Sequence, residues 1–364
     1  MKRYFLILLM FVGLAVSPFV TATASEGEEG KVDPKEIIFE HLSDRYGWEV
    51  PFCHSQSIPL PIIVRDYTGS WHLFSSERLM HGAEYDGFRI ATEGPNAKHI
   101  VSMRPAADGS MEEYAPLDLS VTKNVAGLFI SALVVVLLCM KARRWYSKNG
   151  FKAPRKLTGI VEVIVEFIYF GVIRSILGPK ARRFAPYLLT VFFFILIMNL
   201  LGLIVIFPGG ANLTGNVAVT LVLALFTFGF TNLLGTKHYW KDIFWPDVPI
   251  WLKCPIPIMQ TIEVFGIFTK PAALTVRLFA NMMGGHMIVI TLTLLIFIFA
   301  AFGAVFTGVS VVVSVAFSLF MLLLDVLVSF IQAYVFTMLS TIFIALAQEG
   351  GHEEHEEAVA ETAK

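Results

Sequence analysis

A long and nearly uncharged stretch close to the C-terminus most constrains how this chain can fold. Between Pro257 and Ala347, the only side chains that carry a charge or titrate are Glu263, Lys270, Arg277, His286, Asp325 and Tyr334. In lipid, every backbone hydrogen-bonding group must be satisfied internally, so such a stretch forms helices or a closed barrel. A barrel would show short alternating segments, whereas these apolar runs are continuous. The stretch therefore predicts membrane-spanning helices.

The composition of the whole chain agrees with a membrane protein. Its 364 residues include 32 Phe, and only 16% are charged; the mean hydropathy is +0.67. Soluble domains carry about 25% charged residues. The expected fold class is therefore an all-α polytopic membrane protein. The three cysteines lie in different regions without a CxxC or Cys/His cluster, so we expect no structural disulfide and no metal site.

Residues 1–24 have the pattern of a signal peptide. Lys2 and Arg3 precede an apolar run over residues 5–16, and Ala22-Thr23-Ala24 provides a small-residue cleavage site. An uncleaved N-terminal anchor is the alternative. Either interpretation predicts that the residues that follow are exported.

Residues 25–120 are polar and are expected to form a small α/β periplasmic segment. We expect a helix at 35–45 and two short strands, 58–64 and 71–74, around a turn that contains Asp66 and Gly69. The segment shows no catalytic or binding motif, and its scattered histidines lack ligand spacing.

Basic residues after the first predicted span, 124–140, indicate its orientation. They are Lys141, Arg143, Arg144, Lys148, Lys152, Arg155 and Lys156. By the positive-inside rule this flank is cytoplasmic, so residues 25–120 face the periplasm, in agreement with the signal peptide.

Further helices follow in the transmembrane domain, residues 121–347. Glu162 and Glu166 lie i,i+4 in the otherwise apolar stretch 157–177, which predicts an interfacial amphipathic helix. Spans are expected at 184–207 and 216–234 and as two helices after residue 257, which makes about five in all. If helical, 310–347 would be about 57 Å long, nearly twice the hydrocarbon thickness of about 30 Å. It must break near Asp325 or tilt strongly. Residues 348–364 form an acidic tail, expected to be cytoplasmic and disordered.

Polar residues of the helix after Pro257 are arranged in a stripe. Glu263, Lys270 and Arg277 are spaced by seven, and Asn281 extends the stripe by one turn. From the helical rise, Glu263 lies about 21 Å to the cytoplasmic side of Arg277, and His286 about 13 Å to the periplasmic side. Gly284 and Gly285 would allow another helix or a moving partner to come close.

The last helix carries a matching face, formed by Asp325, Ser329 and Gln332. If the two helices are antiparallel, Gln332 lies near the level of Arg277 when Asp325 lies near the level of His286. An imidazole and a carboxylate at the same depth in the membrane can transfer a proton between them, or each can stabilise the charged form of the other.

Each of these residues also has a structural interpretation. Lys270 is expected to snorkel to the interface, and Glu263 could be interfacial too. Asn281 and Gln332 could join helices by hydrogen bonds. Arg277 is the hardest to explain in this way, because a guanidinium stays charged and costs from about 2.5 to more than 10 kcal/mol at a bilayer centre. It is the strongest indication of function.

The motif Arg277-Leu-Phe-x-Asn281, with Glu263 and Lys270-Pro271 before it and Asp325 and Gln332 after it, resembles subunit a of the proton-translocating F-type ATP synthase. The resemblance covers about residues 117–347 and is most specific from 257 to 347. It implies that the last two helices are long, tilted and packed against the ring of c subunits. It also implies a bacterial inner-membrane location among membrane lipid. The implied partners are the c ring, the b subunits, the rest of the complex and protons, without nucleic acid.

The resemblance also implies a role for each residue of the site. Arg277 corresponds to the essential arginine between two proton half-channels, Asn281 and Gln332 to its neighbouring amides, and Glu263 to the inner acidic group. In many bacterial relatives, the acid and the imidazole occupy each other's positions at His286 and Asp325; the order here is the mitochondrial type. The implied function is to couple proton flow to rotation and ATP synthesis.

The sequence has no phosphate-binding G-x-x-x-x-G-K-[ST] motif, so we expect a non-catalytic subunit without cofactors. An ion-coupled secondary transporter is the main alternative, but it would show internal repeats with paired broken helices. A membrane anchor for the periplasmic segment is a second alternative, and it would not need Arg277, His286 and Asp325.

Overall fold

The computed structural model describes residues 44–49, 57–92, 94, 96–105, 111–150, 152–154, 157–204, 210, 212–244, 258–300 and 304–348. The predicted signal peptide, most of the predicted helix 35–45 and the tail beyond Gln348 lie outside these residues. The chain divides into two compact units. One comprises Met1–Ile130, Leu201–Asn212 and Met287–Leu322; the other comprises Ser131–Leu200, Leu213–His286 and Leu323–Lys364.

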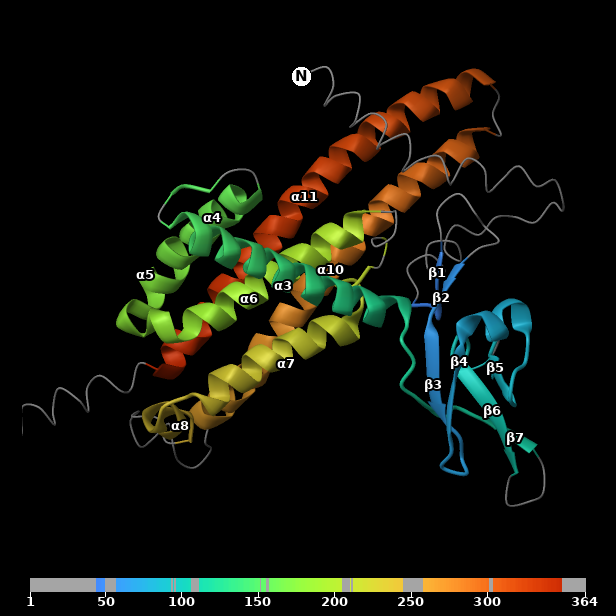
Figure 1. Ribbon diagram of the computed structural model, residues 1–364, viewed down its shortest axis with the longest axis horizontal. Coiled ribbons are helices and arrows are strands. Elements are labelled where there is room, and N and C mark those ends of the chain that lie inside the picture. The colour runs from blue at the N-terminus through green and yellow to red at the C-terminus, as the bar shows by residue number, and fades with distance from the viewer. Residues whose placement is uncertain are drawn as a thin grey trace, which may run out of the picture. The chain divides into compact units, whose positions relative to one another are not determined.

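The N-terminal segment of the first unit is built from short antiparallel strands around a small core (Figure 1). Its elements are β1 (Gly47–Glu49), β2 (Ser57–Pro59), β3 (Pro61–Arg65), β4 (Trp71–Ser75), the 3-10 helix η1 (Ser76–Gly82), β5 (Phe88–Ile90), β6 (Ile100–Pro105), β7 (Met111–Tyr114) and β8 (Leu117–Asp118). The sheets are β1-β2, β4-β3-β8 and β5-β6-β7. Residues of both three-stranded sheets contribute to one core, which includes Ile62, Val64, Phe74, Phe88 and Ile100.

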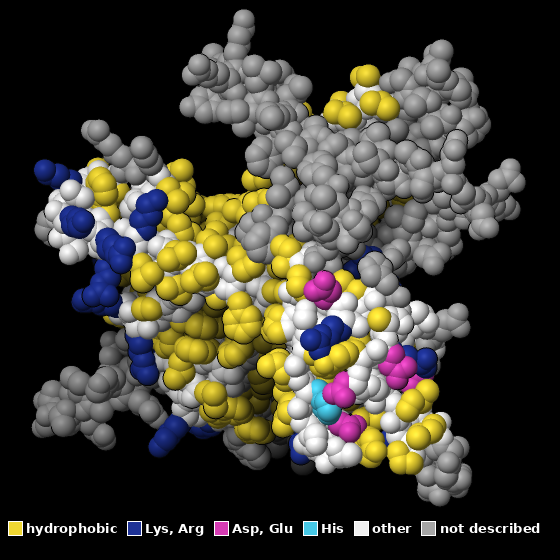
Figure 2. All heavy atoms as spheres, turned by 45° about the vertical axis from the view of Figure 1, so that its right-hand side comes forward, with side chains coloured by type: hydrophobic (Ala, Val, Ile, Leu, Met, Phe, Trp, Pro, Cys, Tyr) yellow, Lys and Arg dark blue, Asp and Glu magenta, His cyan; other side chains and the backbone are white. Residues whose placement is uncertain are grey.

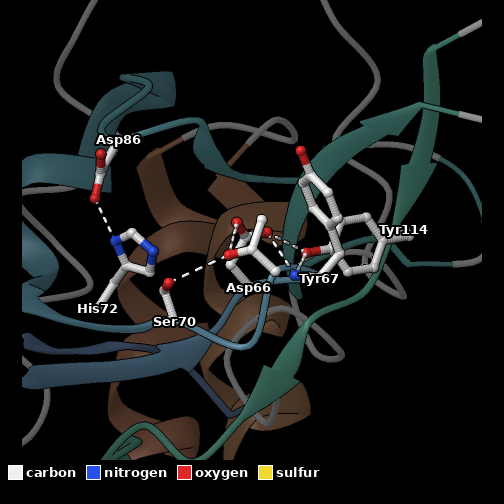
Figure 3. Close-up of polar contacts among 7 residues, drawn as sticks. Asp66, Tyr67, Ser70, His72, Asp86 and Tyr114 are labelled. Carbon is white, nitrogen blue, oxygen red and sulfur yellow. Dashed lines mark hydrogen bonds and ion pairs between the residues drawn. The ribbon is translucent and has the colours of Figure 1, made fainter.

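The predicted pair of strands around Asp66 and Gly69 is confirmed as the β3–β4 hairpin, in which Ile63 pairs with Leu73. Gly69 has a φ of 89°, which a residue without a Cβ adopts readily. Asp66 holds the turn by accepting hydrogen bonds from the Tyr67 backbone N–H (2.6 Å) and the Tyr114 hydroxyl (2.8 Å) (Figure 3). In its described part, the segment predicted to be α/β contains strands and one 3-10 helix; its predicted α-helix stays a prediction.

The remaining described elements are helical. They are α3 (Lys123–Asn149), α4 (Leu157–Ile168), the π-helical η2 (Tyr169–Ile173), α5 (Arg174–Leu177), the 3-10 turn η3 (Gly178–Lys180), α6 (Ala181–Leu203), α7 (Val217–Leu233), α8 (Lys237–Phe244), α10 (Ile258–Ala300) and α11 (Ala304–Gln348). By length and composition, four described stretches could cross a membrane: Lys123–Asn149, Leu157–Leu203, Val264–Leu292 and Val311–Gln348, and Val217–Leu233 is a shorter apolar helix. Figure 2 shows hydrophobic side chains over much of the visible helical surface. A mostly helical, multi-pass membrane protein is confirmed.

The predicted interfacial helix 157–177 forms one arm of a helical hairpin. Gly178 has a φ of 53°, and there the chain turns back from α5 into α6 (Figure 1). The other arm, α6, is the best buried helix, since Leu188, Phe192, Ile195 and Met198 are all inaccessible to solvent. On α4 and η2, the side chains of Ile160, Val163, Phe167 and Phe170 are more than half exposed. The surface location of 157–177 stays a prediction.

Two other segments hold the C-terminal end of α11. The Lys180 ammonium donates a hydrogen bond to the Gln348 carbonyl oxygen at 2.8 Å. The Thr236 backbone N–H donates to the Ala347 carbonyl oxygen at 2.9 Å. The last carbonyls of a helix lack partners within the helix and carry its negative end, so a cation and an N–H group stabilise them. These contacts fix α11 relative to α6 and α7.

Candidate functional site

Helices α10 and α11 lie antiparallel in the second unit, and two contacts define their register. The Asn281 side-chain amide donates a hydrogen bond to Gln332 Oε1 at 2.6 Å. Lys270 Nζ lies 5.5 Å from the centroid of the Phe343 ring. From Lys270 to Asn281, and from Gln332 to Phe343, the chain advances by the same number of residues, about 16 Å of helix. The alignment is therefore maintained over several turns.

Arg277 lies on an exposed face of α10. The residues exposed around it, Ala272, Ala273, Val276 and Ala280, are apolar, and most are small. Ala273 and Ala280, four residues before and three residues after Arg277, share its face of the helix. Arg277 thus presents a permanent positive charge within an apolar surface that has little side-chain bulk.

The amide pair lies one helical turn after Arg277 along α10. Gln332 is 4% exposed, whereas Asn281 is exposed on α10. Their hydrogen bond joins a buried position on α11 to the open face that carries Arg277. An amide offers both donors and acceptors, so this pair can bind a passing water or protonated group.

The Asp325 carboxyl group lies against Gly285, the residue before His286. A Cβ atom added to Gly285 would lie 2.7 Å from Asp325 Oδ1 and 3.2 Å from its Cγ, so the carboxyl group occupies the space that a side chain would need. His286 is the next residue on α10. Gly284, by contrast, would have nothing within 4 Å of a Cβ. The structure thus brings Asp325 to the residue beside His286, whereas the proton-transfer role of the two stays a prediction.

Sequence reasoning missed a buried polar network next to Asp325. Thr214 Oγ1 donates to Asn199 Oδ1 at 2.8 Å, and Asn199 Nδ2 donates to the Ser329 carbonyl oxygen at 3.5 Å. Ser329 Oγ in turn donates to the Asp325 carbonyl oxygen at 2.7 Å. Asn199, Thr214 and Ser329 are each at most 2% exposed. The one sequence feature that could have indicated this network is Asn199, an amide side chain within the apolar run of the predicted span 184–207.

Two further predicted residues, Glu263 and Lys270, lie on α10 before Arg277. Glu263 lies on α10 about 21 Å from Arg277 along the helix axis, and its side chain is outside the described residues. The Lys270 ammonium group lies against Phe343, and the residue lines a small pocket with Asn232 and Tyr239. That Lys270 snorkels to the membrane interface stays a prediction. This cation–π contact joins α10 to α11. Among the residues that the structure describes, no group of three His, Cys, Asp or Glu could hold a metal ion.

Comparison with known proteins adds an independent finding. Residues 125–345 match the family described as ATP synthase A chain, and residues 37–119 match a domain of unknown function, DUF8433. The chain is 40% identical over 272 residues to ATP synthase subunit a of Pelodictyon phaeoclathratiforme, which covers 72% of this chain and 76% of that protein. It is 40% identical over 250 residues to the Chloroherpeton thalassium subunit, covering 67% of this chain and 70% of that protein. The subunit from Anaeromyxobacter sp. is 33% identical over 335 residues, with 88% of this chain and 72% of that protein covered.

Proposed function

The chain belongs to the ATP synthase subunit a family, and from that premise we propose that it forms two proton half-channels against the ring of c subunits. Membership makes it a membrane-sector subunit of a proton-translocating ATP synthase. The proposal adds the path of the proton, the residues that define it, and the c ring and b subunits as partners.

The observation that carries the proposal is the exposed face of α10 around Arg277. A permanent charge within an apolar surface in lipid needs an anionic partner, because leaving it unpaired costs several kcal/mol. A carboxylate on a neighbouring membrane helix would supply that partner. The small side chains of Ala273 and Ala280 would let the neighbouring helix approach closely.

In the proposed path, a proton from the periplasm reaches the ring carboxylate through the outer site. His286 and Asp325 exchange the proton at one level of the membrane, and the pair Asn281–Gln332 passes it on towards the exposed face of α10. The Asn281–Gln332 hydrogen bond and the contact between Asp325 and Gly285 support a continuous polar path between α10 and α11.

The ring site then turns through lipid in its neutral form and releases the proton towards Glu263 on the cytoplasmic side. Arg277 favours the ionised form of the arriving carboxylate and blocks a direct leak between the half-channels. Each proton that crosses about 100 mV releases about 2.3 kcal/mol, which a leak would dissipate.

Arg277→Ala tests this function. We expect the variant complex to assemble but to show neither ATP-driven proton pumping in inverted vesicles nor proton-driven synthesis. Val276→Ala is the matched control, because Val276 precedes Arg277 on α10, is 62% exposed and carries no charge. Normal pumping by the Arg277 variant would contradict the half-channel assignment. Proton flux through the purified chain without a c ring would favour the secondary transporter instead.

We also propose that residues 1–24 are a cleaved signal peptide, that 25–120 are periplasmic and that 348–364 are cytoplasmic. The exposed basic residues at the end of α3, Lys141, Arg143, Arg144 and Lys148, support this orientation. Mass spectrometry of the purified subunit should find Ser25 as the first residue. Protease added to intact spheroplasts should cleave the segment 25–120, and protection from it would reverse the orientation.

A further inference from the structure

The β4-β3-β8 sheet has one buried face and one open apolar face. Ile62, Val64 and Phe74 point into the core and are at most 8% exposed. Because side chains alternate along a strand, their neighbours lie on the opposite face. The open face belongs to the first unit, as does the beginning of α3.

Strand register arranges this open face in two rows across the sheet. Arg65 pairs with Trp71 on one side and with Leu117 on the other. In the next row Ile63 pairs with Leu73, and its carbonyl oxygen accepts a hydrogen bond from the Leu119 N–H at 2.9 Å. Trp71, Leu73, Leu117 and Leu119 are 54%, 73%, 56% and 58% exposed.

A free face of an antiparallel sheet in water is normally polar, so this composition is unusual. The β5-β6-β7 sheet, in contrast, carries two ion pairs. Arg89–Glu113, at 3.0 Å, lies on one face of that sheet, and Arg104–Glu112, at 3.1 Å, lies at the end of the other. The open face of the β4-β3-β8 sheet is apolar except for Arg65, a composition of the kind that marks an interaction surface.

The apolar face is tied to the start of a membrane helix. The Lys123 N–H donates to the Arg45 carbonyl oxygen at 2.9 Å, and the Asn124 N–H donates to Asp44 Oδ1 at 3.2 Å. Lys123 comes four residues after Leu119, so about 14 Å of chain at most separates the two. Phe129, in the second turn of α3, is already 69% exposed. The apolar face is thus continuous along the chain with exposed apolar surface at the start of α3.

The polar groups of the face suit a lipid headgroup. The Arg65 guanidinium lies 5.7 Å from the centroid of the Trp71 ring. Tryptophan is enriched where membrane meets water. Arginine can bury its aliphatic stem against an apolar surface while its guanidinium stays at the boundary between membrane and water. The planar guanidinium also matches the geometry of a phosphate group.

We propose that the open face formed by Ile63, Arg65, Trp71, Leu73, Leu117 and Leu119 lies on the surface of the lipid bilayer at the end where α3 begins. Trp71 and Leu73 enter the boundary between headgroups and acyl chains, and Arg65 binds lipid phosphate. The strand segment then lies on the membrane surface and fixes the position of the start of α3.

Spin labels on the full-length chain in phospholipid nanodiscs test this inference. Leu73→Cys places a label on the face, and Met111→Cys is the matched control, since Met111 is 72% exposed on β7 of the other sheet. Both variants are made after replacement of the native cysteines. Collisions with oxygen, which partitions into lipid, and with a water-soluble nickel chelate give the depth of each label.

We expect the label at 73 to lie about 5 Å below the phosphate level and the label at 111 to lie in water. Leu119→Cys, directly after β8 and on the other side of β3 from Leu73, should repeat the result at 73. Two results would overturn the inference. In one, the labels at 73 and 111 are equally accessible to the nickel chelate; in the other, the label at 73 is shielded from both reagents, which would mean that protein covers the face.

Discussion

The contact between Gly285 and Asp325 can be tested by the addition of one methyl group. In Gly285→Ala, the new Cβ would lie 2.7 Å from Asp325 Oδ1, whereas ordinary contacts begin at 3.4 Å. The carboxyl group must therefore move by about 0.7 Å; overpacking of this kind typically costs about 1–3 kcal/mol. Alanine recovers about 1 kcal/mol of helix propensity, and the atom that must move is the end of a side chain. We therefore expect the complex to assemble.

Proton flux, in contrast, should fall steeply. A misplacement of about 1 Å at a reacting group can lower a rate by about 100-fold. For the smaller shift expected here, we predict a decrease between about 10-fold and 100-fold. The assay is passive proton flux through the membrane sector after removal of the catalytic sector, normalised to the amount of assembled subunit.

Gly284→Ala is the control for this experiment. It adds the same methyl group to the same helix, but nothing lies within 4 Å of the new atom. Its flux should equal that of the unmodified chain. If Gly285→Ala conducts normally, or if both variants are equally slow, the position of the Asp325 carboxyl group does not limit proton transfer and the reasoning fails.

Two further predictions address the outer pair and the strand segment. If, as proposed, His286 and Asp325 act as one unit, His286→Asp combined with Asp325→His should regain much of the flux that either single Ala replacement loses. A double variant as slow as the product of the single effects would show that they act independently. Burial raises the pKa of Asp66, but hydrogen bonds from Tyr114, the Tyr67 N–H and Thr68 outweigh it and lower the pKa below its ordinary value of 3.8. Stability from Asp66 is therefore fully present above pH 3.8 and is lost as the pH falls further. Thermal unfolding of the full chain in detergent should show less acid sensitivity in Asp66→Asn; an unchanged pH profile would exclude this contribution.

Features within one segment could be predicted from the amino-acid sequence. Continuous apolar runs predicted helices, and the spacing of Arg277 and Asn281 placed them on adjacent turns. The turn residues Asp66 and Gly69 predicted the β3–β4 hairpin, because their conformational preferences act over a few residues. The resemblance to the ATP synthase family likewise rested on a short local motif and was confirmed.

Contacts between segments were decided only by the tertiary structure. The spacing on α10 gave the depth of His286 but not the carboxyl group of Asp325 against Gly285. The sequence also could not predict that Lys270 lies over the Phe343 ring or that Asn199 contacts Ser329. Such contacts depend on how far each helix is rotated and shifted against its neighbours. Side-chain packing across the whole bundle sets that rotation and shift, whereas the periodicity of a single helix determines only which of its own residues share a face.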